Sequence, residues 1–189
     1  TIDDALAEGT ETITVSLGTI TGGGFEQIAS DPAHATVTTT ISDDAGPFGP
    51  GTPGAEDTCL VSISGPGSVV EGQVASGYTV SLSQPAVTDV VVKLTYTGTA
   101  TDGSDYTAVT SVTIPAGQSS ATFDITTIDD ALAEGTETIT VSLGEITGGG
   151  FEAIAGNPAQ ATVTTSLVDD SDPFGPEDTC LVSLTGPGT

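Results

Sequence analysis

The side chains of this sequence that could do chemistry are carboxylates, and they come in closely spaced groups. The segment TIDDALAEGTETITVSLG, residues 1–18, places Asp3, Asp4, Glu8 and Glu11 close together, and the same letters return at 127–144. The chain of 189 residues has 26 Asp and Glu but only one Lys or Arg, which gives a formal net charge of -25. Because self-repulsion on this scale destabilises a compact state, the pattern predicts bound cations, high external salt or disorder.

The composition favours a folded β-protein over disorder. Hydrophobic residues make up 36% of the chain, and Val, Ile, Leu and Thr alternate with polar residues. An acidic surface repels nucleic-acid phosphates and anionic lipid head groups, so neither is an expected partner. No run of eighteen apolar residues occurs, so we expect no membrane insertion in this segment. The abundance of Gly, Thr, Ser, Ala and Val without Met or Trp indicates an extracellular, secreted or cell-surface protein.

Internal repeats organise the chain. Residues 1–50 align without a gap with 127–176, with 40 identities, and EDTCLVSISGPGS from Glu56 matches EDTCLVSLTGPGT from Glu177. Self-similarity at this period predicts a tandem array of ordinary-sized domains. We expect the first fragment to need strands from a neighbouring repeat. The predicted division is 1–50 as the C-terminal part of a preceding repeat, 51–58 as a linker, 59–172 as one complete repeat, 173–179 as a linker, and 180–189 as the first strand of the next repeat.

Within the complete repeat, short alternating runs separated by turn residues predict a β-sandwich. The one acidic segment with some helical character, IDDALAEGTE, is short and contains Gly135, so no helix is expected. The predicted strands are 59–64, 78–83, 89–97, 111–117, 121–128, 137–144 and 161–168. The positions expected to face the core are Val61, Ile63, Tyr78, Val80, Leu82, Val90, Val92, Leu94, Phe123, Ile125, Ile139, Val141, Leu143 and Val163.

Most acids of the complete repeat lie at predicted strand ends, where loops from alternate ends gather at one pole of a sandwich. A loose basin of many carboxylates favours Ca²⁺ over Mg²⁺, because Mg²⁺ demands a tight octahedron and holds its water. A solvated acidic face and a halophile's general acidity remain alternatives, although a halophilic coat would also place acids on exposed strand faces, where Thr and Ser predominate. The acids in question are Glu71, Asp102, Asp105, Asp129, Asp130, Glu134, Glu137, Asp169, Asp170 and Asp172.

Four segments in this order resemble the Calx-beta domain, which occurs in sodium–calcium exchangers and in long arrays of bacterial surface proteins and adhesins. They are VVEG at 69–72, GTATDGSDY at 98–106, VTIPAGQSSATFDI at 112–125 and DDALAEGTETITVSL at 129–143. The resemblance implies an immunoglobulin-like sandwich of two antiparallel sheets, repeated in a rod or filament, with a Ca²⁺ cluster near the C-terminal linker.

The resemblance also implies a set of calcium ligands. Asp172 is a further acid near the end of the repeat, but Ser171 separates it from Asp170, so its role departs from the family pattern. The implied ligands of the complete repeat are Glu71, Asp105, Asp129, Asp130, the Leu132 carbonyl, Glu134, Glu137, Asp169 and Asp170, and those of the first fragment are Asp3, Asp4, Glu8, Glu11, Asp43 and Asp44.

Ions at the end of the last strand would tie the following linker to the domain that it leaves. We therefore expect a calcium-binding spacer or filament-forming repeat of a large extracellular protein, with neighbouring repeats as partners and self-association into fibres. The alternative is an adhesive module that binds a glycan or protein directly. An enzyme is not expected, because the complete repeat has no histidine for a triad and its paired carboxylates are expected to bind ions.

The aromatic residues and cysteines allow two interpretations each. Tyr96 and Tyr106 are expected in the core or at a sheet edge. The Phe of each TGGGFE segment, Phe25 and Phe151, is either an exposed contact or part of a plain flexible loop. Cys59 and Cys180 occupy equivalent positions, and Cys59 shares the parity of Val61 and Ile63, which indicates a buried free thiol. The alternative is a covalent bond between repeats or strands of a fibre.

Overall fold

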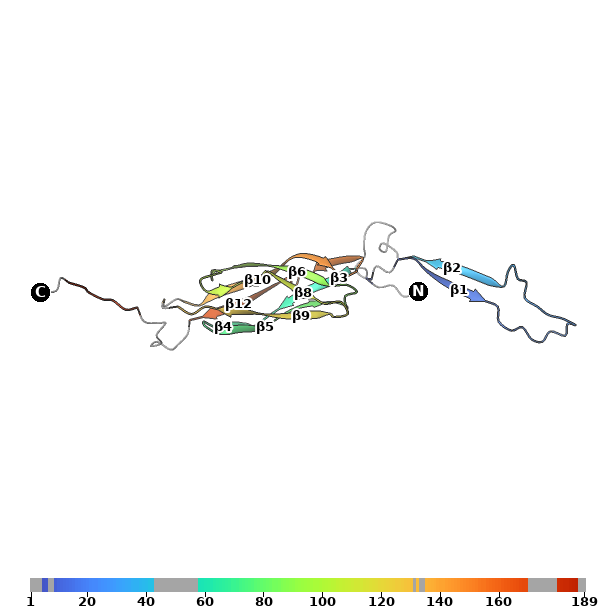
Figure 1. Cartoon of the computed structure of the whole chain (residues 1–189), viewed down its shortest axis with the longest axis horizontal. Helices are drawn as coiled ribbons and strands as arrows, with labels where there is room; N and C mark the ends of the chain where they lie inside the picture. Colours follow the sequence, from blue (N-terminus) through green and yellow to red (C-terminus); the bar gives the residue numbers. More distant parts are fainter. Residues whose placement is uncertain are drawn as a thin grey trace.

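The computed structural model describes residues 5–6, 9–42, 58–130, 132, 135–169 and 180–186. A two-sheet β-sandwich occupies 58–169, and a separate two-stranded hairpin lies N-terminal to it (Figure 1). Throughout these ranges the regular structure is all β, and none of them contains a helix long and apolar enough to cross a membrane. The predicted all-β sandwich is therefore confirmed.

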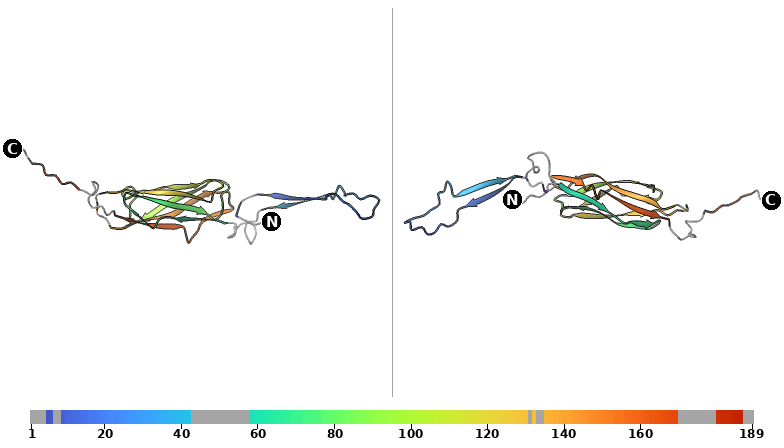
Figure 2. Two further views of the ribbon diagram at one scale, coloured as in Figure 1. Left: turned by 90° about the horizontal axis from the view of Figure 1, so that it is seen from below. Right: turned by 180° about the vertical axis from the view of Figure 1, so that it is seen from behind.

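Two five-stranded sheets face each other in the sandwich (Figure 2). The first has the order β4-β12-β10-β6-β8, with bounds Ser68–Val70, Thr162–Val168, Glu137–Gly148, Val90–Gly98 and Ser111–Ile114. The second has the order β11-β3-β5-β9-β7, with bounds Ala153–Gly156, Thr58–Ser64, Val74–Leu82, Ser120–Thr127 and Tyr106–Thr107.

All seven predicted strands are present, with ends shifted by a few residues, and three short strands are additional. Of these, β4 pairs parallel with β12, and β11 pairs parallel with β3, at one edge of each sheet. The remaining pairs between strands are antiparallel, as predicted. The third addition, β7, is only two residues long and pairs with β9.

The core lies between the sheets and is built from the alternating apolar positions. Every position predicted to face inward is buried except Phe123, Leu143 and Val163, which are half-buried and pack against the core. Tyr78 stacks on Phe123 with ring centroids 5.1 Å apart. The Tyr78 hydroxyl also reaches across to the other sheet, where it lies 2.5 Å from Oγ1 of Thr165. Because the Thr165 hydroxyl donates to the Pro66 carbonyl, Tyr78 is the donor in that bond.

The N-terminal hairpin repeats part of the sandwich. Strands β1 (Glu11–Ser16) and β2 (Thr36–Ile41) pair with Glu11 opposite Ile41, which is the register of Glu137 opposite Leu167 in β10 and β12. However, Ile13 is 50% exposed, whereas its counterpart Ile139 is fully buried. The local sequence therefore sets the register, while burial depends on the second sheet.

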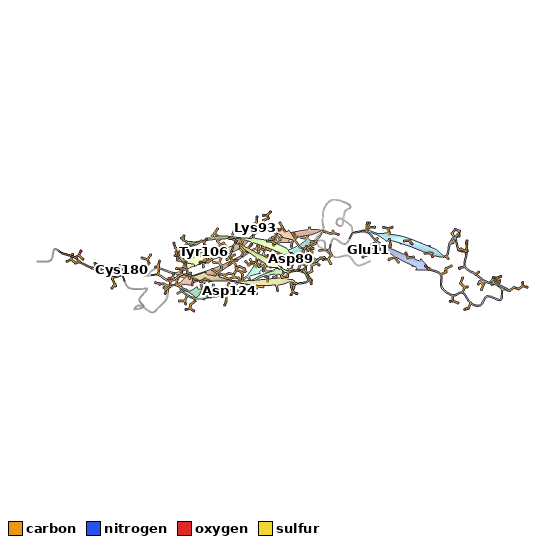
Figure 3. The ribbon with its side chains drawn as sticks, viewed as in Figure 1. Glu11, Asp89, Lys93, Tyr106, Asp124 and Cys180 are labelled. Atoms are coloured by element: carbon orange, nitrogen blue, oxygen red, sulfur yellow. The ribbon has the colours of Figure 1, made fainter. Side chains whose placement is uncertain are left out.

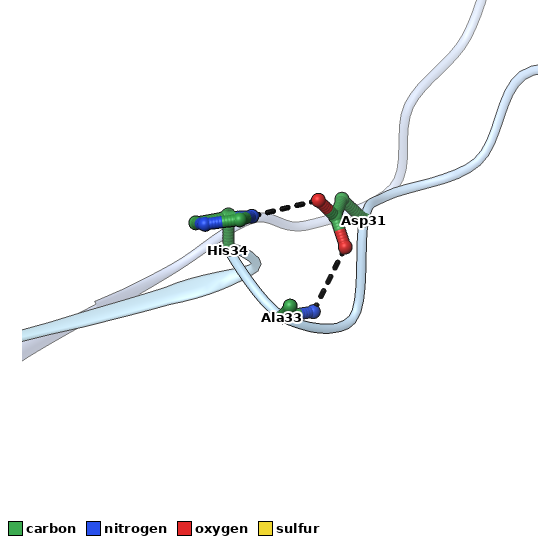
Figure 4. A network of polar contacts seen from close by, with 3 residues as sticks. All are labelled: Asp31, Ala33 and His34. Carbon is green, nitrogen blue, oxygen red and sulfur yellow. Dashed lines mark hydrogen bonds and ion pairs between the residues drawn. The ribbon is translucent and has the colours of Figure 1, made fainter.

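The turns before β2 and β12 also share one geometry despite different residues. Asp31 accepts a bond from the Ala33 amide at 2.9 Å and lies 2.7 Å from Nδ1 of His34 (Figure 4). In the complete repeat, Asn157 Oδ1 accepts from the Ala159 amide at 3.1 Å, and the Asn157 side chain donates to Gln160. An Asp and His in one copy thus replace the Asn and Gln of the other without changing the turn.

Candidate metal site

The loops that carry the acids meet at the end of the sandwich where β12 ends. Figure 3 places Tyr106 and Asp124 toward this end and Asp89 toward the opposite one. We call this end the acidic pole and define it by Glu71, Asp105, Asp129, Asp130, Glu137 and Asp169. Backbone hydrogen bonds hold its loops together, from Glu71 N to Val168 O (3.0 Å), Thr127 N to Gln73 O (3.2 Å), Ile128 N to Asp105 O (2.9 Å) and Ala100 N to Thr138 O (3.2 Å).

Glu71 lies deepest among these acids, with 6% of its surface exposed. The next residue, Gly72, has a φ of +71°, which an L side chain rarely adopts. A Cβ placed on Gly72 would lie 3.2 Å from Cβ of Asp129 and 3.5 Å from its Oδ2. Gly72 thus permits the loop after β4 to pack directly against the Asp129 carboxylate. The sequence interpretation did not single out this glycine, although its place in VVEG was the available signal.

The loop between β6 and β7 is shaped by its own acids. Asp105 is half-buried, and its Oδ2 accepts a bond from the Thr101 amide at 2.5 Å. Asp102 is exposed and accepts from the Ala108 amide at 2.9 Å. Both carboxylates therefore stabilise the loop conformation that carries Asp105 to the pole.

The loop between β9 and β10 and the end of β12 complete the described part of the pole. Asp129 is half-buried, and the exposed Asp130 accepts a bond from the Leu132 amide at 2.7 Å. Glu137 opens β10 and Asp169 follows β12, and both are half-buried. The predicted ligands that lie outside the described residues are Glu134 and Asp170 here, and Asp3, Asp4, Glu8, Asp43 and Asp44 in the first fragment.

Electrostatics at the pole are dominated by negative charge. Lys93, the cation of the complete repeat, lies on the exposed side of β6, where its Nζ is 2.5 Å from Oε2 of Glu145. That hydrogen bond raises the pKa of Lys93 and lowers that of Glu145. Burial raises the pKa of Tyr106, and the charges of Asp102 and Asp105 raise it further. The negative charges near the pole therefore make it harder for Tyr106 to lose its proton.

The residues present fit a hard cation by their chemistry. Carboxylate oxygens are the ligands that Ca²⁺ prefers, and burying a carboxylate is less costly when a cation binds it. Among the residues that the structure describes, however, no group of three or more Asp, Glu, His or Cys side chains is arranged to hold a metal ion. The structure thus gathers Glu71, Asp105, Asp129, Asp130, Glu137 and Asp169 at one pole without assembling a coordination sphere from them. Their assignment as ligands stays a prediction.

The aromatic residues, the cysteines and Glu11 differ in how deeply they are buried. Tyr106 is buried and Tyr96 is half-buried against the core, as expected. Cys59 is a fully buried free thiol, while Cys180 is an exposed free thiol. Phe25 is 71% exposed, whereas Phe151 packs partly against the core. Glu11 lies exposed at the start of β1.

The sheet order and the packing of the two sheets define a sandwich of the Calx-beta kind. Among solved structures, the apo form of the Calx CBD1 domain aligns with 60% of this chain and 98% of its own, at 21% identity and a TM-score of 0.51. CBD12 from CALX1.2 aligns at 20% identity and a TM-score of 0.49, over 60% of this chain and 45% of its own. The alignment with CBD1 confirms the predicted immunoglobulin-like, Calx-beta-like fold.

The family is shown by sequence. Residues 57–170 match the LapA domain, and the chain belongs to this family. A search among curated proteins gave no match. Membership of the LapA domain family supports a structural or adhesion-related module.

Proposed function

We propose that this chain consists of calcium-binding structural repeats of an extracellular surface protein, in which Ca²⁺ at each acidic pole fixes the angle between successive repeats. The observation that carries the proposal is the gathering of buried or half-buried carboxylates at the end of the sandwich where the chain leaves it. These carboxylates belong to Glu71, Asp105, Asp129, Glu137 and Asp169. Membership of the LapA domain family supports the cell-surface setting.

Calcium would act here by joining the domain to the segment that follows it. Asp169 comes directly after β12, and the Glu71 amide bonds to the carbonyl of the last β12 residue, Val168. An ion shared by Glu71 and Asp169 would therefore bridge the loop after β4 and the start of the linker. Proline at 173 and 176 further restricts the linker sequence.

Ion binding would also stabilise the fold. A ligand that binds only the folded state raises the free energy of unfolding with its concentration. Extracellular sites of this chemistry have a Kd of about 10⁻⁴ to 10⁻³ M, so millimolar Ca²⁺ fills them substantially. The expected result is a spacer that is stiffer and more stable with Ca²⁺ than without it.

Thermal unfolding of the full chain tests this proposal. Circular dichroism is recorded with millimolar Ca²⁺, with Mg²⁺, and with chelator at matched ionic strength, for the wild type and for Glu71→Gln. We expect Ca²⁺ alone to raise the Tm of the wild type substantially, and to raise that of Glu71→Gln by a smaller amount. Glu26→Gln is the matched control, because it removes one exposed carboxylate from the first fragment.

Equal melting temperatures in all three solutions would contradict the proposal. The acids would then be a solvated or halophilic face, and the adhesive module would become the favoured function. An equal Ca²⁺ response of Glu71→Gln and the wild type would place the ion away from Glu71.

A further inference from the structure

The start of the chain contacts the complete repeat at the end opposite the acidic pole. Leu6 forms an antiparallel β-bridge with Phe151, and the Glu152 amide donates to the Ala5 carbonyl at 3.1 Å. Ala5 is only 2% exposed, although it is not part of the continuous core of the sandwich. The segment Ala5–Leu6 therefore has a defined place on a domain to which it does not belong by sequence alignment.

This contact lies where the complete repeat begins. Phe151 and Glu152 lead directly into β11, which runs parallel to β3 with Ala153 beside Thr58. We call this end, with residues 84–89 and 148–152, the N-terminal pole. In Figures 1 and 2 the β1–β2 hairpin starts beside this end of the sandwich in all three views.

The repeat alignment shows that both partners of this contact occur twice. Leu6 corresponds to Leu132, and Phe151 corresponds to Phe25, at the same spacing of 126 residues. Where the two copies meet, Leu6 and Phe151 are half-buried. Within the described ranges no contact joins their counterparts to a neighbouring copy, and Leu132 is 61% exposed and Phe25 71% exposed. Each repeat thus has a Leu at its acidic pole and a Phe at its N-terminal pole.

The aromatic ring of each Phe lies over the glycine run that precedes it. Gly148, Gly149 and Gly150 have φ values of +89°, +96° and +71°, and the three equivalent glycines at 22–24 have +91°, +90° and +65°. A Cβ on the middle glycine would lie 2.4 Å from the ring of Phe151, and 2.8 Å from the ring of Phe25 in the other copy. The ring thus lies over the middle glycine in both copies, including the copy without a sandwich.

In the complete repeat the loop is also anchored. The amides of Val87 and Thr88 donate to the Gly149 carbonyl at 2.8 and 3.4 Å, and the Gly149 amide donates to the Asp89 carbonyl at 3.2 Å. These bonds fix the loop to the segment between β5 and β6. Phe151 is therefore presented on a rigid support at the N-terminal pole.

We propose that the Leu of the DDALAE segment in one repeat and the Phe of the TGGGFE segment in the following repeat form an apolar joint between the two repeats. Leu6 with Phe151 is one closed joint, and Leu132 and Phe25 are open halves whose partner is a further copy of this repeat. The joint rests on the proposed tandem array and does not require Ca²⁺. Because Asp129, Asp130 and Leu132 belong to one segment, the joint and the acidic pole share a structural element.

A disulfide cross-link tests the joint in the full chain. The bond from Glu152 N to Ala5 O makes Leu6 and Phe151 a non-hydrogen-bonded antiparallel pair, whose Cα atoms are typically about 4.5 Å apart and within disulfide range. Leu6→Cys with Phe151→Cys is prepared with Cys180→Ser, and Cys59 is left because it is fully buried. In dilute solution with a glutathione buffer, we expect rapid intramolecular closure, seen as the loss of two hydrogens by intact mass.

Leu6→Cys with Phe25→Cys is the matched control, because Phe25 has the same local sequence and loop shape without the joint. We expect it to close at least tenfold more slowly. As a second measurement, Leu6→Asp should speed hydrogen exchange of the Glu152 amide, while Leu132→Asp leaves it unchanged. Equal closure of the two cysteine pairs, or an unchanged Glu152 amide in Leu6→Asp, would overturn the joint.

Repeating the cross-link with Ca²⁺ and with chelator separates this inference from the proposed function. Closure in either solution supports the joint, whatever the effect of Ca²⁺ on the melting temperature. Failure to close in both solutions, with a melting temperature that still rises with Ca²⁺, would overturn the joint and leave the calcium site standing.

Discussion

Tyr96 and Tyr106 show how single side chains support the acidic pole from below. Their rings lie 5.7 Å apart at an interplanar angle of 35°. The Tyr96 hydroxyl donates to the Val109 carbonyl at 2.8 Å and accepts from the Val109 amide at 3.1 Å. It thereby fixes the segment that connects β7 to β8. Burial raises the pKa of Tyr96 to about 12, in part opposed by the bond with Val109.

This pKa predicts a loss of stability at high pH. An unfolded tyrosine loses its proton near pH 10, whereas folded Tyr96 keeps it up to about pH 12. The stabilising contribution is therefore complete below pH 10 and is lost as the pH rises through 12, because the unfolded state then binds fewer protons. We expect the free energy of unfolding to fall between about pH 10 and about pH 12 in urea titrations, and to fall less steeply in Tyr96→Phe.

Lys93→Gln is the control for this experiment, because the pKa of Lys93 is also raised, by its bond with Glu145, and the lysine titrates in the same window. An unchanged pH dependence in Tyr96→Phe would show that Tyr96 ionises as easily in the folded chain as in the unfolded one.

At the scale of elements, the two hairpins separate local from tertiary effects. β1–β2 and β10–β12 share a register and a cross-strand threonine pair, with Oγ1 atoms 3.1 Å apart for Thr14 and Thr38 and 2.9 Å for Thr140 and Thr164. They differ in burial, since Val15 is 65% exposed and Val141 is fully buried. An isolated two-stranded hairpin is marginally stable in water, whereas core strands open only with the whole domain.

Hydrogen exchange should therefore differ between near-identical strands. We expect amides of β12 to exchange on the order of 10³-fold or more slowly than those of β2. Mass spectrometry can distinguish ATVTTTIS at 35–42 from ATVTTSLV at 161–168, although residues 1–18 and 127–144 are identical. The denatured chain is the control, in which the two peptides should exchange alike. Equal protection in the native chain would mean that β1–β2 is covered by another surface, for example that of a second chain.

The elements also show how much the sequence could predict. Long alternating runs identified the core strands and their inward side chains, because a period of two fixes which face is buried. The strands β4, β7 and β11 are three, two and four residues long, too short for any periodicity to be visible. The acids lie at predicted strand ends, and this position predicted that the loops carrying them gather at one pole of the sandwich. The burial of Glu71 and the bridge between Leu6 and Phe151 depend on packing between segments distant in sequence, which local patterns do not encode.

The whole molecule carries a formal charge of -25, and its stability should depend on salt accordingly. Raising NaCl from about 0.01 to about 0.15 M shortens the Debye length from about 30 to about 8 Å. In chelator we expect this change to raise the Tm by about 4 °C or more, which corresponds to about 1 kcal/mol for a domain of this size. With Ca²⁺ present the rise should be smaller, because bound ions already reduce the repulsion.

KCl in place of NaCl is the control, since screening does not depend on the identity of the monovalent cation. A Tm independent of salt would show that repulsion among the carboxylates does not limit the stability of the folded chain.

The placement of the first and last strands of the sandwich determines how a repeat responds to tension. β3 begins at the N-terminal pole and β12 ends at the acidic pole, and both run along the length of the domain (Figure 1). Pulling on the two ends draws β3 and β12 in opposite directions along their own axes. β3 is bonded on both sides, to β11 and β5, and β12 to β4 and β10. Their hydrogen bonds are therefore loaded in shear and share the force, instead of opening one after another from an end.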